Sequence, residues 1–236
     1  MLTGIRDLDY KILNELEDRD LVSICLSNKE ASKLCNDQTF WLNRILTKFP
    51  NVPSEVFLKN KKGRWSDYYI KDLRELNTLK LEPTYILNIG ADNGRDDWLI
   101  IGLNRGADIH EDNDYALRSA SEKGYSDVVR LLLQAGADVH APDYGGPDAS
   151  LRLTSSHGHP AVVKILLEAG ADVHAVDDFA LRLASRYGYL ETVKMLLEAG
   201  ADVHADDDYA LEMASVNGYS EIIKILLEAG ASNDFK

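Results

Sequence analysis

Gly106-Ala107-Asp108-Ile109-His110 opens a phrase, Gly-Ala-Asp-Ile/Val-His, that the chain repeats at a nearly constant interval. The intervals are 30, 34, 30 and 30 residues, and the last copy is shortened to Gly-Ala-Ser, giving copies at 106–110, 136–140, 170–174, 200–204 and 230–232. Each full copy is followed by a leucine, 11 residues after its first glycine and 15 in the longer unit, and seven residues after the leucine by another glycine (Leu117 and Gly124, Leu151 and Gly158, Leu181 and Gly188, Leu211 and Gly218). A period in this range predicts a solenoid of stacked units.

One unit, residues 170–199, shows what each repeat is expected to form. The run 180–185 (Ala-Leu-Arg-Leu-Ala-Ser) predicts a short helix whose small residues let a neighbouring helix approach closely. The aspartates at 177–178 are expected to start this helix by accepting its free backbone N–H groups. Gly188 is expected to end it in the left-handed conformation, and 193–197 predicts a second helix. Neither helix can bury its apolar face alone, so the units must stack.

The pattern extends further towards the N-terminus than the phrase itself. A shift of 30 residues aligns Tyr115-Ala116-Leu117 with Tyr85-Ile86-Leu87, and Gly124 with Gly94. The sequence therefore predicts an all-α solenoid of about five helix-turn-helix repeats, with a degenerate first unit. The expected units are 76–105, 106–135, 136–169, 170–199 and 200–229, with a stub at 230–236.

Residues 76–236 resemble the ankyrin repeat family. The resemblance rests on the Gly-Ala-Asp-Val-His phrase, the apolar helix before it, and the run 180–185 where the family has Thr-Pro-Leu-His-Leu-Ala-Ala. Three units have 30 residues instead of the usual 33, and the missing residues come from the β-turn finger. This shortened form resembles the ankyrin repeats of giant amoeba-infecting DNA viruses of the mimivirus kind. The resemblance implies a protein-binding function, with contacts made by the finger tips and the ends of the first helices.

Mapped by position, the ends of the first helices give five candidate target-binding pairs. The residues in these pairs differ between repeats while the frame around them stays constant (Asp92 and Asn93, Glu122 and Lys123, Ser156 and His157, Arg186 and Tyr187, Val216 and Asn217). This contrast suggests a surface that is free of packing constraints and contacts a partner. Drift of solvent-exposed loop positions would produce the same contrast, so both interpretations stay open.

The unit 136–169 keeps a longer finger, residues 142–148. Its two prolines and two glycines predict a protruding turn that presents Tyr144. Tyrosine is among the residue types that dominate interface energies, so we expect Tyr144 to be the strongest single contact among the fingers.

Residues 1–48 predict a separate module of several short helices. The spacing of its apolar residues, followed by Ser27-Asn28-Lys29 and later by Phe40-Trp41, resembles an F-box. That family docks a Skp-type adaptor of a cullin ubiquitin ligase. Carried over by position, the resemblance gives six adaptor-binding candidates: Leu8, Ile12, Leu13, Leu21, Leu26 and Trp41.

The F-box resemblance has two departures and one alternative. Asp9 stands where the family usually has proline, and Ala31 where it often has a large aromatic residue. Alternatively, these helices only cap the repeats. Against a pure cap, the segment 49–75 intervenes: it is expected to hold a turn-rich connector and then a capping helix over 65–76.

Charge and cysteine content restrict the possible partners. The net charge is −13, but residues 1–75 carry 13 basic and 12 acidic residues, whereas 76–236 carry 13 and 27. The repeats should therefore repel nucleic acid and favour a neutral or basic protein. Two cysteines without metal or redox spacing, no signal peptide and no membrane-length apolar stretch predict an intracellular, cytoplasmic protein that does not bind membranes, with a nuclear location left open.

Two repeated features invite a metal assignment. The histidines His110, His140, His174 and His204 recur at one position, but helix packing should separate equivalent residues by about 8–10 Å, too far for one zinc ion. The acidic run 206–208 lacks the glycine and the distal glutamate of a calcium-binding EF-hand loop, so a helix N-terminal turn explains it. We expect no metal, no cofactor and no catalytic site.

These observations leave two functional hypotheses. The first is a substrate receptor that links a target protein, held by the repeats, to a cullin-type ubiquitin ligase through the N-terminal module. The second is a free-standing ankyrin-type binder that sequesters or blocks a host protein, with purely structural N-terminal helices.

Overall fold

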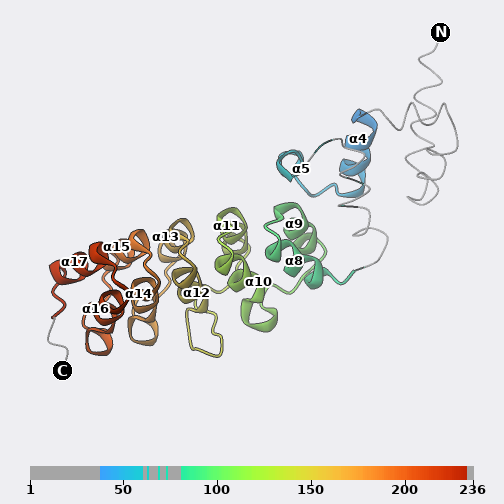
Figure 1. Cartoon of the computed structure of the whole chain (residues 1–236). Coiled ribbons are helices and arrows are strands. Elements are labelled where there is room, and N and C mark those ends of the chain that lie inside the picture. Colours follow the sequence, from blue (N-terminus) through green and yellow to red (C-terminus); the bar gives the residue numbers. More distant parts are fainter. Residues whose placement is uncertain (1–37, 61–62, 64–68, 70–72, 74–80, 233–236) are drawn as a thin grey trace, which may run out of the picture. The chain divides into compact units, whose positions relative to one another are not determined.

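The computed structural model describes residues 38–60, 63, 69, 73 and 81–232 (Figure 1). Regular structure in these residues is helical, apart from an isolated antiparallel bridge between Asp143 and Gly146. The all-α prediction is therefore confirmed. The helices are α4 (Gln38–Lys48), α5 (Ser54–Asn60), α8 (Pro83–Asp92), α9 (Asp96–Asn104), α10 (Glu111–Glu122), α11 (Ser126–Gln134), α12 (Ala149–His157), α13 (Pro160–Glu168), α14 (Ala175–Tyr187), α15 (Leu190–Glu198), α16 (Ala205–Asn217) and α17 (Ser220–Glu228).

The chain divides into two compact units: residues 1–86 with 100–107, and residues 87–99 with 108–236. The first unit has an aromatic core. The ring of Trp41 lies 5.3 Å from that of Phe40 and 5.6 Å from that of Tyr69, and all three side chains are buried. The segment expected to be a turn-rich connector contains α5, and three of its apolar side chains are buried (Phe49, Val52 and Phe57). These residues contribute to a core, so the segment is more than a linker.

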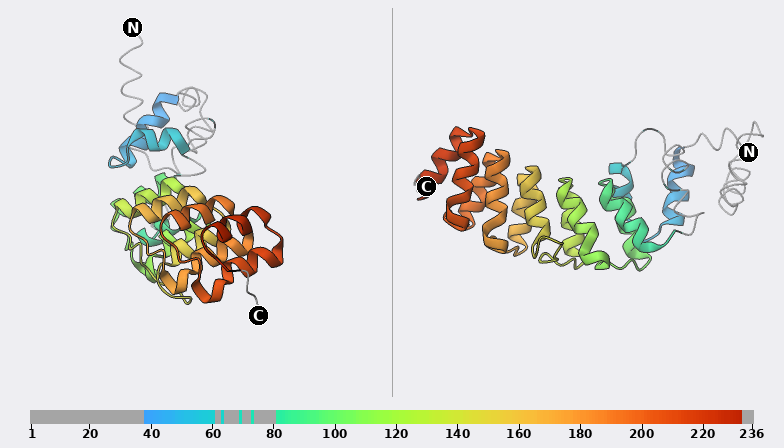
Figure 2. Two further views of the ribbon diagram at one scale, coloured as in Figure 1. Left: turned by 90° about the vertical axis from the view of Figure 1, so that its left-hand side faces the viewer. Right: turned by 60° about the horizontal axis from the view of Figure 1, so that its bottom comes forward.

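The second unit consists of helix pairs stacked in two layers (Figure 1). The first helices, α10, α12, α14 and α16, contact one another in sequence, and the second helices, α11, α13, α15 and α17, form the other layer. The right-hand view of Figure 2 shows successive pairs side by side. The recurrent leucine of each first helix is fully buried (Leu117, Leu151, Leu181 and Leu211). Burial of one such side chain contributes about 1.5–3 kcal/mol to stability. The leucine that recurs in the sequence is therefore a core residue in every one of these repeats.

Glycines end the helices as the sequence predicts. Gly188 follows α14 with a φ of 82°, in the left-handed region. At the end of α15, the N–H of Ala201 donates to the carbonyl of Leu196, and the N–H of Gly200 to that of Leu197, both over 3.0 Å. This paired arrangement satisfies carbonyl groups that the helix leaves free and turns the chain towards the next finger.

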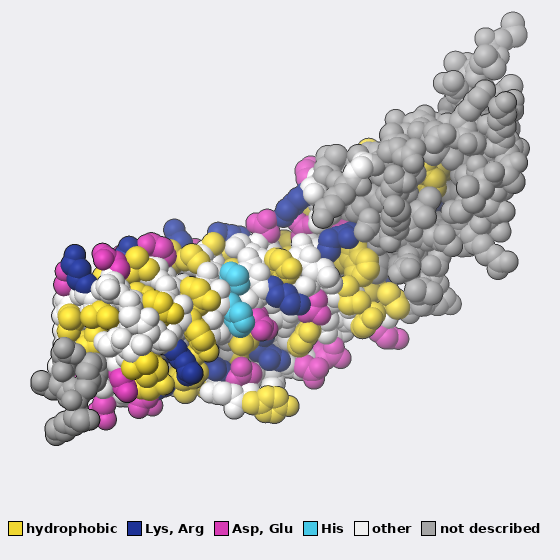
Figure 3. All heavy atoms as spheres, in the orientation of Figure 1, with side chains coloured by type: hydrophobic (Ala, Val, Ile, Leu, Met, Phe, Trp, Pro, Cys, Tyr) yellow, Lys and Arg dark blue, Asp and Glu magenta, His cyan; other side chains and the backbone are white. Residues whose placement is uncertain are grey.

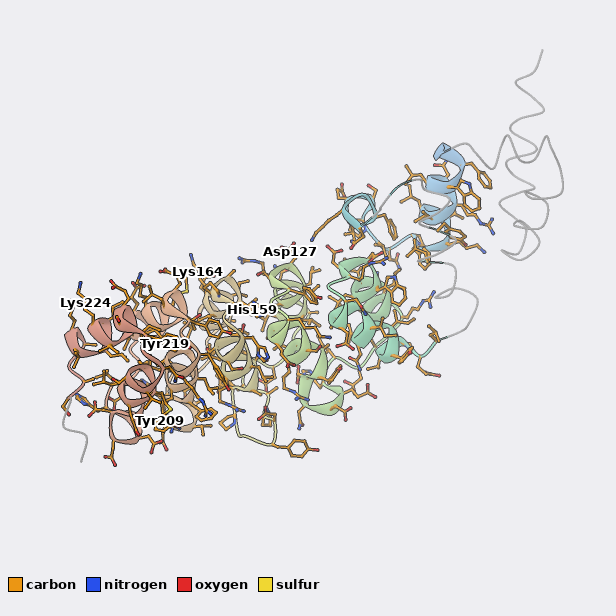
Figure 4. All side chains as sticks on the ribbon, viewed as in Figure 1. Asp127, His159, Lys164, Tyr209, Tyr219 and Lys224 are labelled. Atoms are coloured by element: carbon orange, nitrogen blue, oxygen red, sulfur yellow. The ribbon has the colours of Figure 1, made fainter. Side chains whose placement is uncertain are left out.

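An aromatic ring of each repeat also packs on a glycine of the preceding repeat. Side chains that begin the second helices lie against these glycines (Tyr125 on Gly94, His159 on Gly124, Tyr189 on Gly158 and Tyr219 on Gly188). A Cβ atom added at Gly158 would lie closer than 3.0 Å to the Tyr189 ring. In Figure 4, His159 and Tyr219 lie along the middle of the stack, between the Lys164–Lys224 edge and the finger edge. Glycine is therefore required here by the neighbouring ring as well as by the turn.

Several buried hydroxyl groups in the stack have no hydrogen-bond partner. Thr192 on α15 is 1% exposed, and its hydroxyl is unpaired. The equivalent positions hold Val128, Val162 and Ile222. Similarly, α12 carries unpaired Ser150 and Thr154, where α10, α14 and α16 have alanine. A buried polar group without a partner costs free energy, so these positions reduce the stability of the stack.

Replacing Thr192 with valine is expected to raise the free energy of unfolding by about 1 kcal/mol, because the shape is kept and the buried hydroxyl is removed. Urea unfolding followed by circular dichroism measures this change. Val162→Thr, at the equivalent position of α13, is the matched control and should lose stability by a similar amount. Equal stability of Thr192→Val and the parent chain would mean that the hydroxyl has a partner.

Within the described part of the chain, no helix is both long enough and apolar enough to cross a bilayer.

Candidate protein-binding surface

The short fingers have an unexpected backbone conformation. Three consecutive residues within the first turn of each of α10, α14 and α16 are not helical and have positive φ, for example 56°, 54° and 52° at Val176, Asp177 and Asp178. The prediction that Asp177 or Asp178 caps its own helix is wrong, because the Asp178 carboxylate accepts from His174 and from the N–H of Asp202, and His174, where α14 begins, makes no capping side-chain bond either. Left-handed residues other than glycine cost about 1–2 kcal/mol each, so other contacts must hold these turns in place.

A histidine and an aspartate in each finger supply part of that support. The Nδ1–H of His174 donates to the Asp178 carboxylate over 3.1 Å, and the same carboxylate accepts the N–H of Asp202, in the next repeat, over 2.8 Å. Asp114 and Asp148 make the equivalent pairs of bonds. Each of these buried aspartates therefore ties its own finger to the following repeat. The recurrent histidines orient carboxylates, which is a structural role.

Arginines on the first helices provide a second support. Arg118 donates from Nε to the carbonyl of Asn113 over 3.0 Å and from Nη2 to that of Asp112 over 2.6 Å. Arg152 and Arg182 donate to carbonyls of their own fingers in the same way. All three residues follow the recurrent leucine. We call these contacts the finger staples (Arg118, Arg152 and Arg182 with the carbonyls of their fingers).

The longer finger before α12 ends in a tight turn. The Asp143 and Gly146 main chains exchange two hydrogen bonds of 3.0 and 3.1 Å, and the Asp143 carboxylate accepts from the Gly145 N–H and from Arg152. Burial raises the pKa of Asp143, but the hydrogen bonds from Arg152 and Gly145 outweigh it, so the pKa lies below its usual value. Tyr144 at the tip is fully exposed, at 113% of its reference area. A rigid turn therefore presents a free tyrosine.

A hollow of about 390 Å³ lies beside this tyrosine. It is lined by Asp112, Asn113, Tyr115, Arg118, Asp143 and Tyr144, which come from two successive fingers and the start of α10. In Figure 1 the fingers extend along one edge of the second unit, and acidic side chains recur along that edge in Figure 3. The hollow therefore combines aromatic surface with groups of both charges.

Of the five predicted helix-end pairs, the first two meet. The Lys123 ammonium lies 3.0 Å from the Asp92 carboxylate, which also accepts from the hydroxyls of Ser119 and Tyr115. Burial raises the pKa of Asp92, and these hydrogen bonds outweigh it and lower the pKa. Asp92 and Lys123 thus join neighbouring repeats, while Asn93 bonds to the Ile89 carbonyl of its own helix. These side chains are engaged within the chain.

The other helix-end residues are less engaged. His157 lies 3.6 Å from Glu122 across two repeats, and Ser156 donates to a carbonyl of its own helix. Arg186 lies over the ring of Tyr187, which is 47% exposed. The last pair is also open: Val216 is 73% exposed, and Asn217 donates to the Met213 carbonyl. Exposed apolar surface on the helix ends is therefore concentrated towards the C-terminal repeats.

One of the six predicted adaptor-binding residues, Trp41, lies in the described part of the chain. Leu8, Ile12, Leu13, Leu21 and Leu26 lie outside the described residues. Trp41 is described and is 2% exposed, in contact with Phe40 and Tyr69. Trp41 is therefore part of the core of the first unit.

Among the described residues, no group of three or more histidine, cysteine, aspartate or glutamate side chains could hold a metal ion. The acidic run Asp206–Asp208 has a different use. Asp206 pairs with Arg182 of the preceding repeat, and Asp208 accepts from His204. These carboxylates act as links between and within repeats.

Stacked helix pairs with projecting fingers and an exposed edge define a repeat protein that binds other proteins. A family model described as ankyrin repeats, in three copies, matches residues 69–177 and 151–236, which is more than half of the chain. The chain therefore belongs to the ankyrin repeat family. No curated protein matches it.

The sequence alone did not reveal the finger staples or the hollow. A signal was present, because arginine follows the recurrent leucine in three repeats and glutamate replaces it only at Glu212. That regularity indicates a packing role for the arginine. Its hydrogen-bond acceptors are backbone carbonyls, however, and these leave no mark in the sequence.

Proposed function

We propose that the chain is a substrate receptor: the repeats hold a target protein at the finger edge and helix ends, and residues 1–48 recruit a Skp-type adaptor of a cullin ubiquitin ligase. Membership in the ankyrin family supports the first half. The F-box resemblance of the N-terminal residues supports the second. The proposed setting is the cytoplasm, of a host cell if the source is viral.

Tyr144 is the observation that carries target binding. A large side chain held fully in solvent by a hydrogen-bonded turn gains nothing for folding, since it buries no apolar surface. The same geometry favours binding, because a preorganised aromatic residue loses little conformational freedom when a partner covers it. The exposed carboxylates of Asp112, Asp177 and Asp207 on the three short fingers favour a neutral or basic partner.

Tyr144→Ala is expected to weaken target binding by about 2 kcal/mol, roughly thirtyfold in Kd, and more than any single change in the short fingers. Suitable ligands are peptides selected from a displayed random library on the full-length chain. Fluorescence anisotropy titration gives their Kd. Tyr187→Ala and Asp207→Ala are the comparison variants, and equal losses at all three positions would contradict a dominant role for Tyr144.

The adaptor half is tested by co-purification. The full chain is mixed with a purified Skp-type adaptor, and the experiment is repeated with Leu8→Asp and Ile12→Asp, whose charges should abolish an apolar contact. The Trp41 ring is packed in the core, so in this proposal it supports the fold of the N-terminal module. We expect the unmutated chain to retain the adaptor and both variants to lose it. An unmutated chain that never retains the adaptor would leave a free-standing binder that sequesters or blocks its target.

A further inference from the structure

The finger staples differ in how their remaining N–H groups are used. Arg182 pairs with Asp206 of the next finger, and Arg152 pairs with Asp143 of its own finger. Arg118 occupies the equivalent position in α10 and makes the same carbonyl contacts, yet no carboxylate of the described residues forms an ion pair with it. Two of the three equivalent guanidinium groups thus form an ion pair, whereas Arg118 only helps to lower the pKa of Asp143 through its charge and forms no ion pair with a described residue.

The long finger explains this difference. Arg182 reaches the next finger because that finger is short and places Asp206 beside it. The finger that follows Arg118 is the long one, and its aspartate, Asp143, is turned to Arg152 and the Gly145 N–H. The hollow of about 390 Å³ beside Tyr144 opens at this place, and Arg118 is part of its lining.

We infer that this hollow receives a carboxylate side chain of the bound protein, an aspartate or a glutamate, which pairs with Arg118 while the adjoining residues of the partner cover Tyr144. A carboxylate matches the planar donor geometry of a guanidinium group better than other ligands do. Arg118 is already oriented by two carbonyl groups, so little side-chain entropy is lost on pairing. The inference rests on the proposed use of the finger edge for target binding.

The other charged residues of the hollow further restrict which charges the bound segment of the partner can carry. The carboxylates of Asp112 and Asp143 also line it, and Asp112 forms no ion pair with a described residue, so a second acidic group would be repelled. A basic residue beside the partner's carboxylate would face Asp112 instead. The expected recognition element is therefore a segment with one acidic residue flanked by basic residues, which agrees with a partner that is neutral or basic as a whole.

The test uses peptides selected from a displayed random library on the full-length chain, with their Kd measured by anisotropy. Arg118→Gln should weaken the selected peptides by at least about tenfold, because a charged hydrogen bond is lost. Exchanging the acidic residue of the peptide for its amide should cost a similar factor. The two changes together should cost little more than either alone, as expected for groups that contact each other.

Arg182→Gln is the matched control. It removes an equivalent finger staple and an ion pair, but Arg182 does not line the hollow, so peptide affinity should change little. Thermal unfolding of both variants by circular dichroism shows whether the fingers stay folded. An equal loss of affinity in both variants would mean that Arg118 acts through finger stability, which overturns the inference.

The remaining outcomes separate this inference from the proposed function. Peptides that depend on Tyr144 but bind equally well to Arg118→Gln, or a selection without any Arg118-dependent peptide, would overturn the carboxylate inference and leave target binding at the finger edge standing. Peptides that depend on neither Tyr144 nor Arg118 would overturn both.

Discussion

Gly158→Ala is expected to destabilise the chain by about 3 kcal/mol, through two effects that add. Alanine is strained at the φ of 72° that Gly158 adopts, at a cost of about 1–2 kcal/mol. The new methyl group would also overlap the ring of Tyr189 from the next repeat, and overpacking costs about 1–3 kcal/mol. Urea unfolding followed by circular dichroism gives the change in free energy.

The last repeat contains a matched control for Gly158. Gly218 has nearly the same φ, 74°, but a Cβ atom there would meet nothing within 4 Å. Gly218→Ala should therefore cost only about 1–2 kcal/mol, the backbone contribution alone. Adding Tyr189→Ala to Gly158→Ala should cost less than the sum of the two single changes, because the overlap is relieved. Equal losses at the two glycines would show that the ring contact contributes nothing.

Asp178→Ala is expected to cost about 2–3 kcal/mol. Asp178 is 4% exposed, and its carboxylate accepts hydrogen bonds from both His174 and the N–H of Asp202. Alanine would leave the N–H without its partner at a partly buried position, and would release a left-handed turn that is held by the same contacts. The loss would affect both the finger before α14 and its joint with the next repeat.

Asp208 is the internal control for Asp178. It bonds to His204 in the same way, but its contact beyond the finger is the exposed hydroxyl of Ser232. Asp208→Ala should therefore cost less than about 1 kcal/mol, since water can replace that partner. Hydrogen exchange at the Asp202 N–H should accelerate in Asp178→Ala and stay unchanged in Asp208→Ala. If both variants lose the same stability, the bond between repeats is not what makes Asp178 important.

The helices themselves could be predicted from the sequence because their causes are local. The leucine of each first helix and the glycine seven residues later lie within a single repeat, and their spacing alone predicts where helices run and end. The emergence of Tyr144 could be predicted for the same reason, because two prolines and two glycines around it allow little other than a projecting turn.

The contacts between repeats could not be predicted in the same way. Asp178 reads as a helix cap in the sequence, yet its carboxylate bonds to a backbone N–H that lies 24 residues further on. Asp92 and Lys123 were predicted as free binding residues, but the packing of neighbouring helices brings them within 3.0 Å. Such contacts depend on how far one repeat is rotated and displaced against the next.

The sequence alone determined that the C-terminal part of this protein is a stack of helical repeats, because a regular spacing of leucine and glycine fixes local structure and demands burial between neighbours. Only the tertiary structure decided which polar side chains remain available to a partner. Asp114, Asp148 and Asp178 are engaged by bonds to the following repeat, and Arg152 and Arg182 by ion pairs, whereas the long finger leaves Tyr144 exposed and turns Asp143 to Arg152, so that Arg118 forms no ion pair with a described residue.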